Sequence, residues 1–532
     1  MADDKSGSDI VKSTGMGVIY ITFAKLWFMA TGWALVFVLP QLFEWAADGD
    51  ATAGTAMYGM YGLIITGISF VNNGIVTGTI QSVSRFTAHN EATAATVRKK
   101  ALLTMAISGG VIAIVYALLS GVISEYWLSS DDENLTFYMQ LSAIVITAYA
   151  CYAVFIGTLN GLRRFRTQAL FDVGYTTLKI GLIIGFVLAG FQVLGTVLGF
   201  ICGAAIIGVI AAFATRHTPG NAPFEAKKFI SFAWVIIAYT FVLNLVMMID
   251  IYVLSGFVPK LAKASGMAEG AITEWMKIQA GHYKAVQQLA FIPYQAVIAI
   301  AFVVFPLVSK VARESDGTVA RGYISSSLRF TLILISGLAA VFCGEAEGAM
   351  TLVFPKGYAV AAPALRVLSL GIVAFGVLVI SNTALNAAGK KWHAMVSVLV
   401  GMVVVLGLDS FLLATARSAD ASVLTRTAVG TSLGMLITLV ISLRSVYLQF
   451  KACIPVLTLL RVAVAAGAAI AAARFMPGEG KLMTLIHCIG VLVIYFGILA
   501  AVKEFKQADI DRLKQVLHRK AKQPSSSEGD TK

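Results

Sequence analysis

Apolar runs of about 20 residues recur along the whole chain, separated by short polar segments. A run of this length can cross a bilayer as an α-helix. Lipid offers no partners to backbone groups, so each run must satisfy its own hydrogen bonds as a helix. We predict an all-α polytopic membrane protein with about 14 spans. Their approximate limits are 17–40, 56–80, 101–123, 136–158, 168–190, 193–213, 229–255, 283–307, 328–346, 364–386, 394–415, 424–444, 455–475 and 482–502.

The composition agrees with this pattern. Hydrophobic residues make up 58% of the 532 residues and charged residues only 13%, whereas a soluble domain averages roughly 25% charged residues. The first residues, "MADDKSGSDIVKSTG", are polar and mixed in charge. They lack the basic stretch, apolar core and cleavage site of a signal peptide, so we expect the first span to be retained.

The loops between the spans alternate in charge. Because short cytoplasmic loops are enriched in Lys and Arg, the basic set predicts the cytoplasmic side. Both termini then lie in the cytoplasm, as an even number of spans requires, and the net charge of +13 reflects orientation rather than nucleic-acid binding. The basic set is Arg85, Arg98, Lys99, Lys100, Arg163, Arg164, Arg166, Arg216, Lys227, Lys228, Lys310, Arg313, Arg321, Lys390, Lys391 and the tail from Lys503; the acidic set is Glu44, Asp48, Asp50, Asp131, Asp132, Glu133, Glu345, Glu347, Asp420 and Glu479.

Two segments outside the spans have some helical character. The longest loop on the acidic side, 256–282, is expected to hold a short surface helix near 269–278. The tail after Lys503 has Ile510, Leu513 and Leu517 on one face and many cations around them. Such a helix could lie along an anionic inner leaflet, or it could simply be solvated.

A basic elbow occurs twice. "TLNGLRRFRTQAL" (158–170) follows the fourth span, and "ALNAAGKKWHAMV" (384–396) follows the tenth. Spans 1–6 and 7–12 therefore look like two copies of one six-helix unit with the same orientation, a parallel repeat that is typical of transporters. The expected divisions are 1–16 (N-terminal segment), 17–213 (N-lobe), 229–444 (C-lobe), 455–502 (two extra spans) and 503–532 (basic tail).

Longer stretches carry a family resemblance. They are "GMYGLIITGISFVNNGIVTGTIQSVSRF" (59–86), "FIGTLNGLRRFRTQALFDV" (155–173), "QQLAFIPYQAVIAIAFVVFPLVSKVA" (287–312) and, in order, "FPKGYAVAAPALRVLSLG" and "ALNAAGKKWHAM" within 354–395. In their order and spacing they resemble the multidrug/oligosaccharidyl-lipid/polysaccharide exporter superfamily, in particular its bacterial polysaccharide (Wzx-like) flippase branch.

The resemblance implies a function and a location. Members of that branch move undecaprenyl-pyrophosphate-linked oligosaccharides across the bacterial inner membrane, and a polysaccharide polymerase or export machinery is a possible partner. The related lipid II flippases share the fold and the two extra helices, so that cargo stays open. The drug-antiporter branch usually has 12 spans, which disfavours a cation-coupled drug exporter without excluding it.

Charged residues inside spans are the first candidates for function, because they are costly there. Lys25 matches the position at which flippases of this superfamily place a basic residue facing the cavity, and it could offset a pyrophosphate; it could instead reach the interface. Asp172, Tyr175, Thr176 and Lys179 share one face of the fifth span. This stripe could bind sugar hydroxyls, or it could form a structural ion pair.

Two carboxylates inside predicted spans are candidates for ion coupling. Asp250 in the seventh span could trade a proton or bind Na⁺, although it could also be a solvated cap near the end of the span. Asp409 in the eleventh span is a weaker candidate of the same kind.

Polar and basic side chains elsewhere could contact the cargo. In the eighth span one helix face carries Tyr283, Gln287 and Tyr294, and the neighbouring face carries Gln288 and Gln295. Aromatic and amide side chains are suited to binding sugars. Polar packing between helices explains these residues equally well. The remaining candidates are Asn72, Asn73 and Thr77 in the second span, Arg366 as a pyrophosphate contact or interface anchor, and Arg85, Arg163, Arg164, Lys390 and Lys391 at the inner mouth.

An enzymatic function is disfavoured. "DGD" at 48–50 is the acidic pair that membrane glycosyltransferases use for a metal, but such enzymes also need a sizeable domain outside the membrane. The chain has no Walker A motif. The five cysteines and six histidines lack ligand spacing, so we expect no metal and no cofactor beyond a coupling H⁺ or Na⁺.

Overall fold

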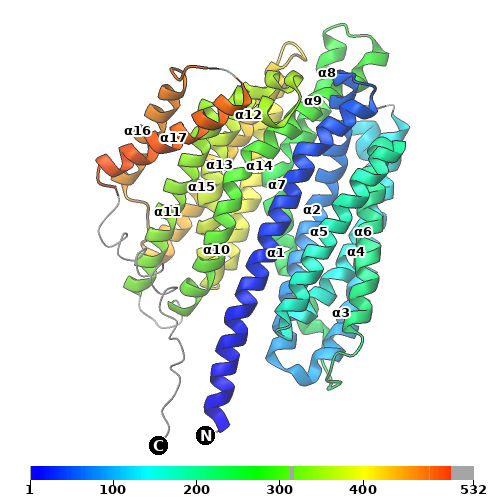
Figure 1. Cartoon of the computed structure of the whole chain (residues 1–532), viewed down its shortest axis with the longest axis vertical. Helices are drawn as coiled ribbons and strands as arrows, with labels where there is room; N and C mark the ends of the chain where they lie inside the picture. Colours follow the sequence, from blue (N-terminus) through cyan, green and yellow to red (C-terminus); the bar gives the residue numbers. More distant parts are fainter. Residues whose placement is uncertain (1, 131, 312–316, 479, 505–532) are drawn as a thin grey trace, which may run out of the picture.

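A computed structural model describes residues 2–130, 132–311, 317–478 and 480–504, and in this part of the chain every regular element is helical (Figure 1). The tail predicted to carry an amphipathic helix, residues 505–532, lies outside the described residues. The longer helices are α1 (Ala2–Ala46), α2 (Ala51–His89), α3 (Ala94–Val122), α4 (Glu133–Gly161), α5 (Phe165–Phe186), α6 (Gln192–Thr215), α7 (Ala226–Met248), α8 (Asp250–Ala264), α9 (Glu269–Ala290), α10 (Ile292–Val311), α11 (Gly317–Gly344), α13 (Ala362–Ala387), α14 (Lys391–Ala414), α15 (Ser422–Phe450), α16 (Val456–Ala473) and α17 (Lys481–Ala501).

Twelve helical stretches in the described residues are long and apolar enough to cross a membrane. One of them, Phe165–Thr215, contains both α5 and α6, because the chain reverses at Gly190 (φ 90°) and Gln192 (φ 47°). The pair α9–α10 makes a further crossing that is not among the twelve. The chain is therefore a multi-pass membrane protein with about 14 crossings, as the apolar pattern predicts.

The seventh and eighth crossings differ from the expectation. Each is broken: α7 ends at Met248 and α8 begins at Asp250, while α9 ends at Ala290 and α10 begins at Ile292. Pro293 explains the second break, because proline lacks the N–H that a continuous helix needs but fits the first turn of a new one. Residues 256–282 are thus mostly the adjoining ends of α8 and α9. The predicted helix near 269–278 is present and begins at Glu269, but it is the start of the longer, largely buried α9 and not a short surface helix.

The start of the chain also differs. α1 is helical from Ala2, so the segment 1–16 is continuous with the first span instead of preceding it as a separate stretch. We call the end of the bundle at which α1 begins the basic end, since the Arg163 and Lys390 elbows lie there too; α8 and α9 meet at the opposite end (Figure 1).

The two halves of the chain pack in the same way. In the N-lobe, α4 contacts α2, α3 and α6, and α5 packs between α6 and α1. In the C-lobe, α13 likewise contacts α9 and α10, α11 and α15, and α14 packs between α15 and the pair α7–α8. This correspondence confirms the predicted repeat of two six-helix lobes.

Small residues close the hairpin in each lobe. Gly195, Gly199 and Gly203 of α6 lie against α5 so closely that a Cβ on any of them would press on the α5 backbone. Gly430 and Gly434 of α15 contact α14 in the same way. Such small-residue stripes let transmembrane helices approach closely and gain dispersion energy.

The repeated elbows have the same backbone geometry. Arg164 N donates to Leu159 O at 2.9 Å around Arg163 (φ 56°), and Lys390 N donates to Leu385 O at 2.8 Å around Gly389 (φ 76°). Both are helix ends of the Schellman type, in which one residue takes the left-handed conformation. The resemblance between the two sequence elbows therefore extends to the hydrogen bonds that end α4 and α13.

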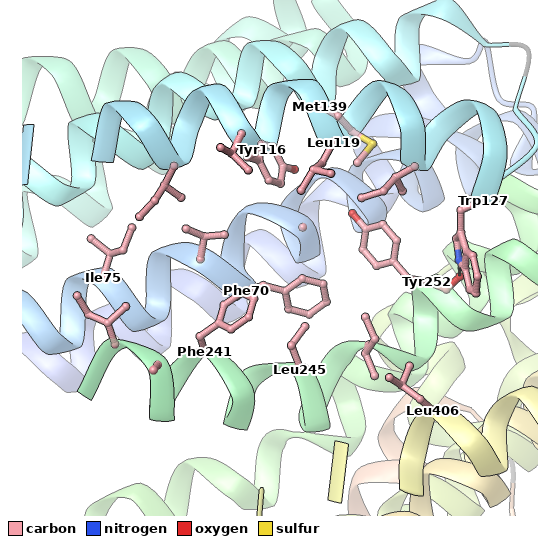
Figure 2. Close-up of a pocket in the computed structure, with 18 of the residues that line it drawn as sticks. Phe70, Ile75, Tyr116, Leu119, Trp127, Met139, Phe241, Leu245, Tyr252 and Leu406 are labelled. Carbon is pink, nitrogen blue, oxygen red and sulfur yellow. Dashed lines mark hydrogen bonds between the residues drawn. The ribbon is translucent and has the colours of Figure 1, made fainter. Parts of the chain in front are cut away.

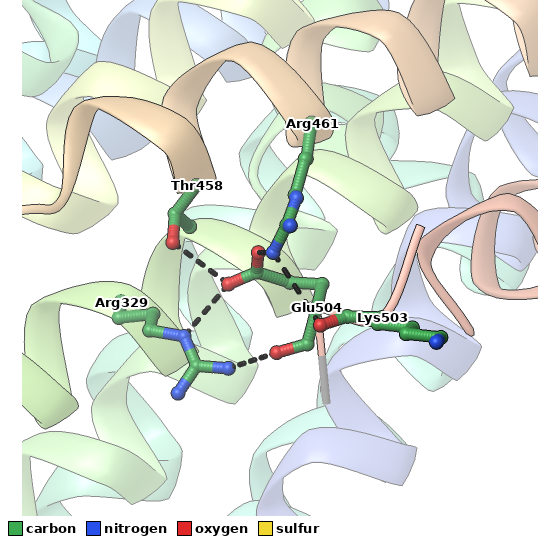
Figure 3. Close-up of polar contacts among 5 residues, drawn as sticks. All are labelled: Arg329, Thr458, Arg461, Lys503 and Glu504. Carbon is green, nitrogen blue, oxygen red and sulfur yellow. Dashed lines mark hydrogen bonds and ion pairs between the residues drawn. The ribbon is translucent and has the colours of Figure 1, made fainter. Parts of the chain in front are cut away.

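The helices α16 and α17 pack on α11 of the C-lobe. A buried carboxylate fixes them there: Glu504 accepts hydrogen bonds from Arg329 Nε (2.7 Å), Thr458 Oγ1 (2.7 Å) and Arg461 (3.0 Å) (Figure 3). Arg329 belongs to α11, so the network joins the end of the last span to the lobe.

Candidate functional site

A cavity of about 480 Å³ lies in the N-lobe where it faces the C-lobe. Helices α1, α2, α4 and α5 form most of its wall, and the C-lobe closes it with Gln288, Phe291 and Gln295. Its polar lining includes Lys25, Tyr61, Ser69, Asn72, Asn73, Thr77, Tyr149, Tyr152, Asp172, Tyr175, Lys179, Gln288 and Gln295.

The charged groups of this cavity are two cations and one anion. Lys25 Nζ lies 3.9 Å from Asp172 Oδ2. Lys179 Nζ lies 4.9 Å from the ring centre of Phe200 and 5.5 Å from that of Tyr175, which are cation–π distances. The predicted stripe on α5 therefore faces the cavity, and Lys25 from α1 meets it. With one carboxylate for two ammonium groups, the cavity carries an excess positive charge.

Amide groups lie deeper along α2. Asn73 Nδ2 donates to Asn244 Oδ1 of α7 at 2.8 Å and so joins the two lobes. The Oδ1 atom of Asn72 is buried and has no hydrogen-bond partner among the described residues. Neighbouring amides and aromatic rings are suited to hydroxyl-rich ligands.

A second polar cluster is buried in the C-lobe. Asp250 Oδ2 accepts hydrogen bonds from Tyr283 (2.6 Å) and Thr431 (3.1 Å), and its Oδ1 accepts one from Gln287 (2.7 Å). Thr431 Oγ1 also lies 3.2 Å from Asp409 Oδ2. The structure thus brings the two predicted coupling residues together around one hydroxyl, with both side chains fully buried.

Two carboxylates at such close quarters cannot both remain charged without compensation. Neither Asp250 nor Asp409 forms an ion pair with a described cationic side chain. A proton or a small cation is the usual way in which buried carboxylate pairs are neutralised. A proton or a small cation bound at this cluster would neutralise the pair.

Lys284 was not predicted from the sequence as a functional residue. Its side chain is buried where α9 meets α2, and Nζ donates to Thr66 Oγ1 at 2.9 Å. Its neighbours Tyr283 and Gln287 hold Asp250, so one turn of α9 touches both the carboxylate cluster and the N-lobe. A lysine near the predicted start of a span looks like an interface residue; the signal was hidden because the helix actually begins at Glu269.

At the end of the bundle away from the basic end, the two lobes contact each other and close the cavity. Lys277 of α9 forms an ion pair with Asp132, the N-cap of α4, at 2.5 Å. Beside it, α2 and α9 are so close that a Cβ on Gly59 would overlap the carbonyl of Lys277. By contrast, the described parts of α1 and α10 make no comparable contact with each other. The lobes are thus joined along α2 and apart between α1 and α10.

Other predicted residues lie elsewhere. Arg366 is exposed at the start of α13 and does not line the cavity. Gln287 belongs to the carboxylate cluster, away from the cavity amides. Arg85 stacks over Phe232 at 4.3 Å at the basic end of α2, and Arg163, Arg164, Lys390 and Lys391 occupy the two elbows.

The "DGD" motif has a structural role. Asp50 caps α2 by accepting hydrogen bonds from Thr52 N (2.8 Å) and Ala53 N (3.2 Å). Among the described residues no three His, Cys, Asp or Glu side chains group as a metal site would require.

Known proteins share this fold. Residues 52–312 match the model of the polysaccharide biosynthesis protein family. The lipid II flippase MurJ in an inward closed conformation is similar over 92% of this chain and 99% of its own, with a TM-score of 0.67 and 13% identity. An outward-facing multidrug resistance MATE transporter is similar over 82% of this chain and 95% of its own (TM-score 0.60, 14% identity).

A third similar structure is a MOP superfamily transporter from Pyrococcus furiosus, over 82% of this chain and 96% of its own (TM-score 0.58, 13% identity). No curated protein matches the sequence closely. Residues 52–312 thus resemble the polysaccharide biosynthesis family, and the chain as a whole shares the two-lobe fold of MurJ and of MATE transporters.

Proposed function

We propose that the protein is a flippase that moves a polyprenyl-pyrophosphate-linked oligosaccharide across the bacterial inner membrane, with undecaprenyl as the polyprenyl group. The observation that carries the proposal is the excess positive charge of the inter-lobe cavity, supplied by Lys25 and Lys179 against Asp172. A pyrophosphate is a strong anion, and a low-dielectric interior requires a fixed countercharge for it.

The rest of the cavity suits the glycan. Asn72, Asn73, Gln288 and Gln295 can exchange hydrogen bonds with hydroxyl groups, while Tyr149 and Tyr175 offer aromatic faces. The polyprenyl chain would remain in the bilayer and enter between α1 and α10, where the lobes are apart. The protein thus carries the headgroup, while the lipid tail stays in hydrocarbon.

The cycle is alternating access. The conformation described has its opposite end shut by Lys277 and Asp132, and the lobes would rock to open that end. H⁺ or Na⁺ at Asp250 and Asp409 would bias the equilibrium between the two states, because a ligand that prefers one state shifts the population toward it. Lys284 and Thr66 provide the link from this cluster to the N-lobe.

Topology follows from charge. The basic elbows and both termini would face the cytoplasm by the positive-inside rule, so Arg85, Arg163, Arg164, Lys390 and Lys391 would surround the mouth at which an anionic headgroup arrives. A polysaccharide polymerase on the far side of the membrane would receive the product.

Lipid II is an alternative cargo of the same chemical class, and the two extra helices α16 and α17 favour such lipid-linked cargo over a drug. The similar MATE structure covers less of this chain than MurJ does. The test compares two probes on the purified full-length protein. We expect a polyprenyl-pyrophosphate oligosaccharide to raise the melting temperature and a lipophilic cationic dye to leave it unchanged; the reverse result would indicate a drug exporter.

A further inference from the structure

A second, apolar space lies between the lobes, behind α2 as seen from the cavity. It has a volume of about 630 Å³ and is bounded by α2 and α3 of the N-lobe and α7 and α8 of the C-lobe (Figure 2). Gly67, Phe70, Val71 and Ile75 of α2 face this groove. The cavity receives other residues of the same helix, such as Ser69, Asn72 and Asn73, so α2 separates the two spaces.

The groove is built for hydrocarbon. Its lining is mostly Phe, Trp, Ile, Leu, Val and Met side chains, with Tyr116 and Tyr252 among them, and Figure 2 shows Phe70, Phe241, Tyr116 and Leu119 directed into it. Two of its few polar groups are already engaged: Tyr252 Oη donates to Leu63 O at 2.7 Å, and Trp127 Nε1 donates to Tyr252 O at 2.8 Å. Such a space offers water too few partners, whereas an apolar chain would gain dispersion contacts.

The groove communicates with the bilayer. Val115 and Leu119, on the α3 wall, are 48% and 51% exposed, and Trp234 on the α7 wall is exposed as well. These side chains lie within membrane-spanning stretches, so the medium outside them is lipid. An acyl chain can enter sideways without crossing a polar layer.

A cationic side chain, Lys260 of α8, lies at one end of the groove. This is the end away from the basic end of the bundle. Lys260 Nζ lies 5.7 Å from the ring centre of Trp127, which lines the groove. Tryptophan is enriched at the level of lipid headgroups. Lys260 is exposed and forms no ion pair with a described side chain, whereas nearby Lys263 is paired with Glu269 at 3.2 Å.

We propose that this groove binds an anionic phospholipid such as phosphatidylglycerol, with one acyl chain between α3 and α7 and the phosphate at Lys260. The ligand is a resident membrane lipid and not the cargo, because the cations that would hold a pyrophosphate lie on the other side of α2. Since its walls come from both lobes, the bound lipid stabilises the conformation in which α2 and α3 contact α7 and α8.

The test uses native mass spectrometry of the full-length protein released from vesicles that contain phosphatidylglycerol and phosphatidylcholine in equal amounts. We expect one phosphatidylglycerol to be retained. Ala238→Trp fills the groove and should abolish retention, whereas the matched Ala205→Trp, on the exposed face of α6, should not. Lys260→Gln should reduce the preference for phosphatidylglycerol about fivefold, and Lys263→Gln should not change it.

Three outcomes would overturn the proposal. They are no retained phospholipid on the wild-type protein, equal retention by the two tryptophan variants, and retention of an added polyprenyl phosphate in place of phosphatidylglycerol. Each variant is first checked for a single monodisperse species, and a photoactivatable phosphatidylglycerol should label α3 or α7 in the wild-type protein. The proposed transport function could fail while this binding stands, because the two tests use different ligands and different residues.

Discussion

Asp250 and Asp409 come from different helices of the C-lobe and share the hydroxyl of Thr431, which lies 3.1 Å from the first carboxylate and 3.2 Å from the second. One hydroxyl hydrogen cannot serve both oxygens at once. A proton or a cation held between the two carboxylates would complete the arrangement, as the proposed ion coupling requires.

The first prediction concerns this pair. Asp409→Asn neutralises one carboxylate, so transport should lose its dependence on the ion gradient and its rate should fall to the level without a gradient. Thr431→Val removes only the bridging hydroxyl and should weaken cation binding by about fivefold. Transport assayed against imposed H⁺ and Na⁺ gradients measures both. A gradient response that persists in Asp409→Asn would remove the pair from the mechanism.

Gly430 of α15, which packs against Asp409, allows a second test of the carboxylate pair. A Cβ on Gly430 would lie 2.2 Å from Asp409 Oδ1, whereas a Cβ on Gly407 meets nothing within 4 Å. Gly430→Ala should therefore displace the Asp409 side chain and impair ion coupling, and Gly407→Ala should behave like the wild-type protein. Equal coupling in the two variants would show that the position of Asp409 is unimportant.

The next prediction concerns the closed end of the bundle. Lys277→Gln removes the ion pair with Asp132 and should raise the population of molecules open at that end, because the pair joins α9 of the C-lobe to α4 of the N-lobe. Labelling of a cysteine introduced at Tyr61, behind the contact, measures the opening. The exchange Lys277→Asp with Asp132→Lys should restore part of the closure; no restoration would mean that the charges do not act as a pair.

The elbows allow a test of the repeat. Arg163 takes the left-handed conformation that Gly389 takes in the other lobe. A side chain there costs about 1 kcal/mol relative to glycine, so Arg163→Gly should leave thermal stability unchanged or raise it, and Gly389→Arg should lower it. Thermal melting of both variants measures this. A large loss of stability in Arg163→Gly would mean that the guanidinium has a structural partner.

Glu504 should make stability depend on pH. Burial alone would raise its pKa, but hydrogen bonds from Arg329, Thr458 and Arg461 hold the pKa below its usual value. The carboxylate therefore stabilises the fold above its unfolded pKa of about 4.3, and that contribution disappears as the pH falls through the lower folded pKa. Glu504→Gln should cost about 3 kcal/mol at neutral pH and remove this acid transition from melting curves.

The fold could be predicted from the sequence because its signals are local. The lengths of the apolar runs predict the spans, and the elbows at 158–170 and 384–396 predict the repeat. In the structure the two elbows also share the hydrogen bond that ends the preceding helix. The breaks at Ile249 and Phe291 were not predicted. Pro293 was a local signal for the second break, but proline is also tolerated inside transmembrane helices.

The candidate site was predictable only in part. Lys25, Asp172 and Lys179 were found because charge inside a span is rare, and the structure places all three at one cavity. Asp250 and Asp409 were found for the same reason, but their proximity is a tertiary property. Thr431 and Lys284 carried no signal of their own: threonine is common in spans, and Lys284 lies where the predicted span begins.

In the proposed function, the protein flips a lipid-linked oligosaccharide whose pyrophosphate is held by Lys25 and Lys179. The most direct measurement uses proteoliposomes with a labelled polyprenyl-pyrophosphate oligosaccharide, where a membrane-impermeant glycosidase added outside cleaves only outer-leaflet label. We expect the wild-type protein to bring the inner-leaflet labelled oligosaccharide within reach of the glycosidase. The double variant Lys25→Gln with Lys179→Gln should slow this exposure at least about tenfold. The double variant with arginine at both positions should retain transport. Protein-independent exposure, or a glutamine double variant as fast as wild type, would contradict the account.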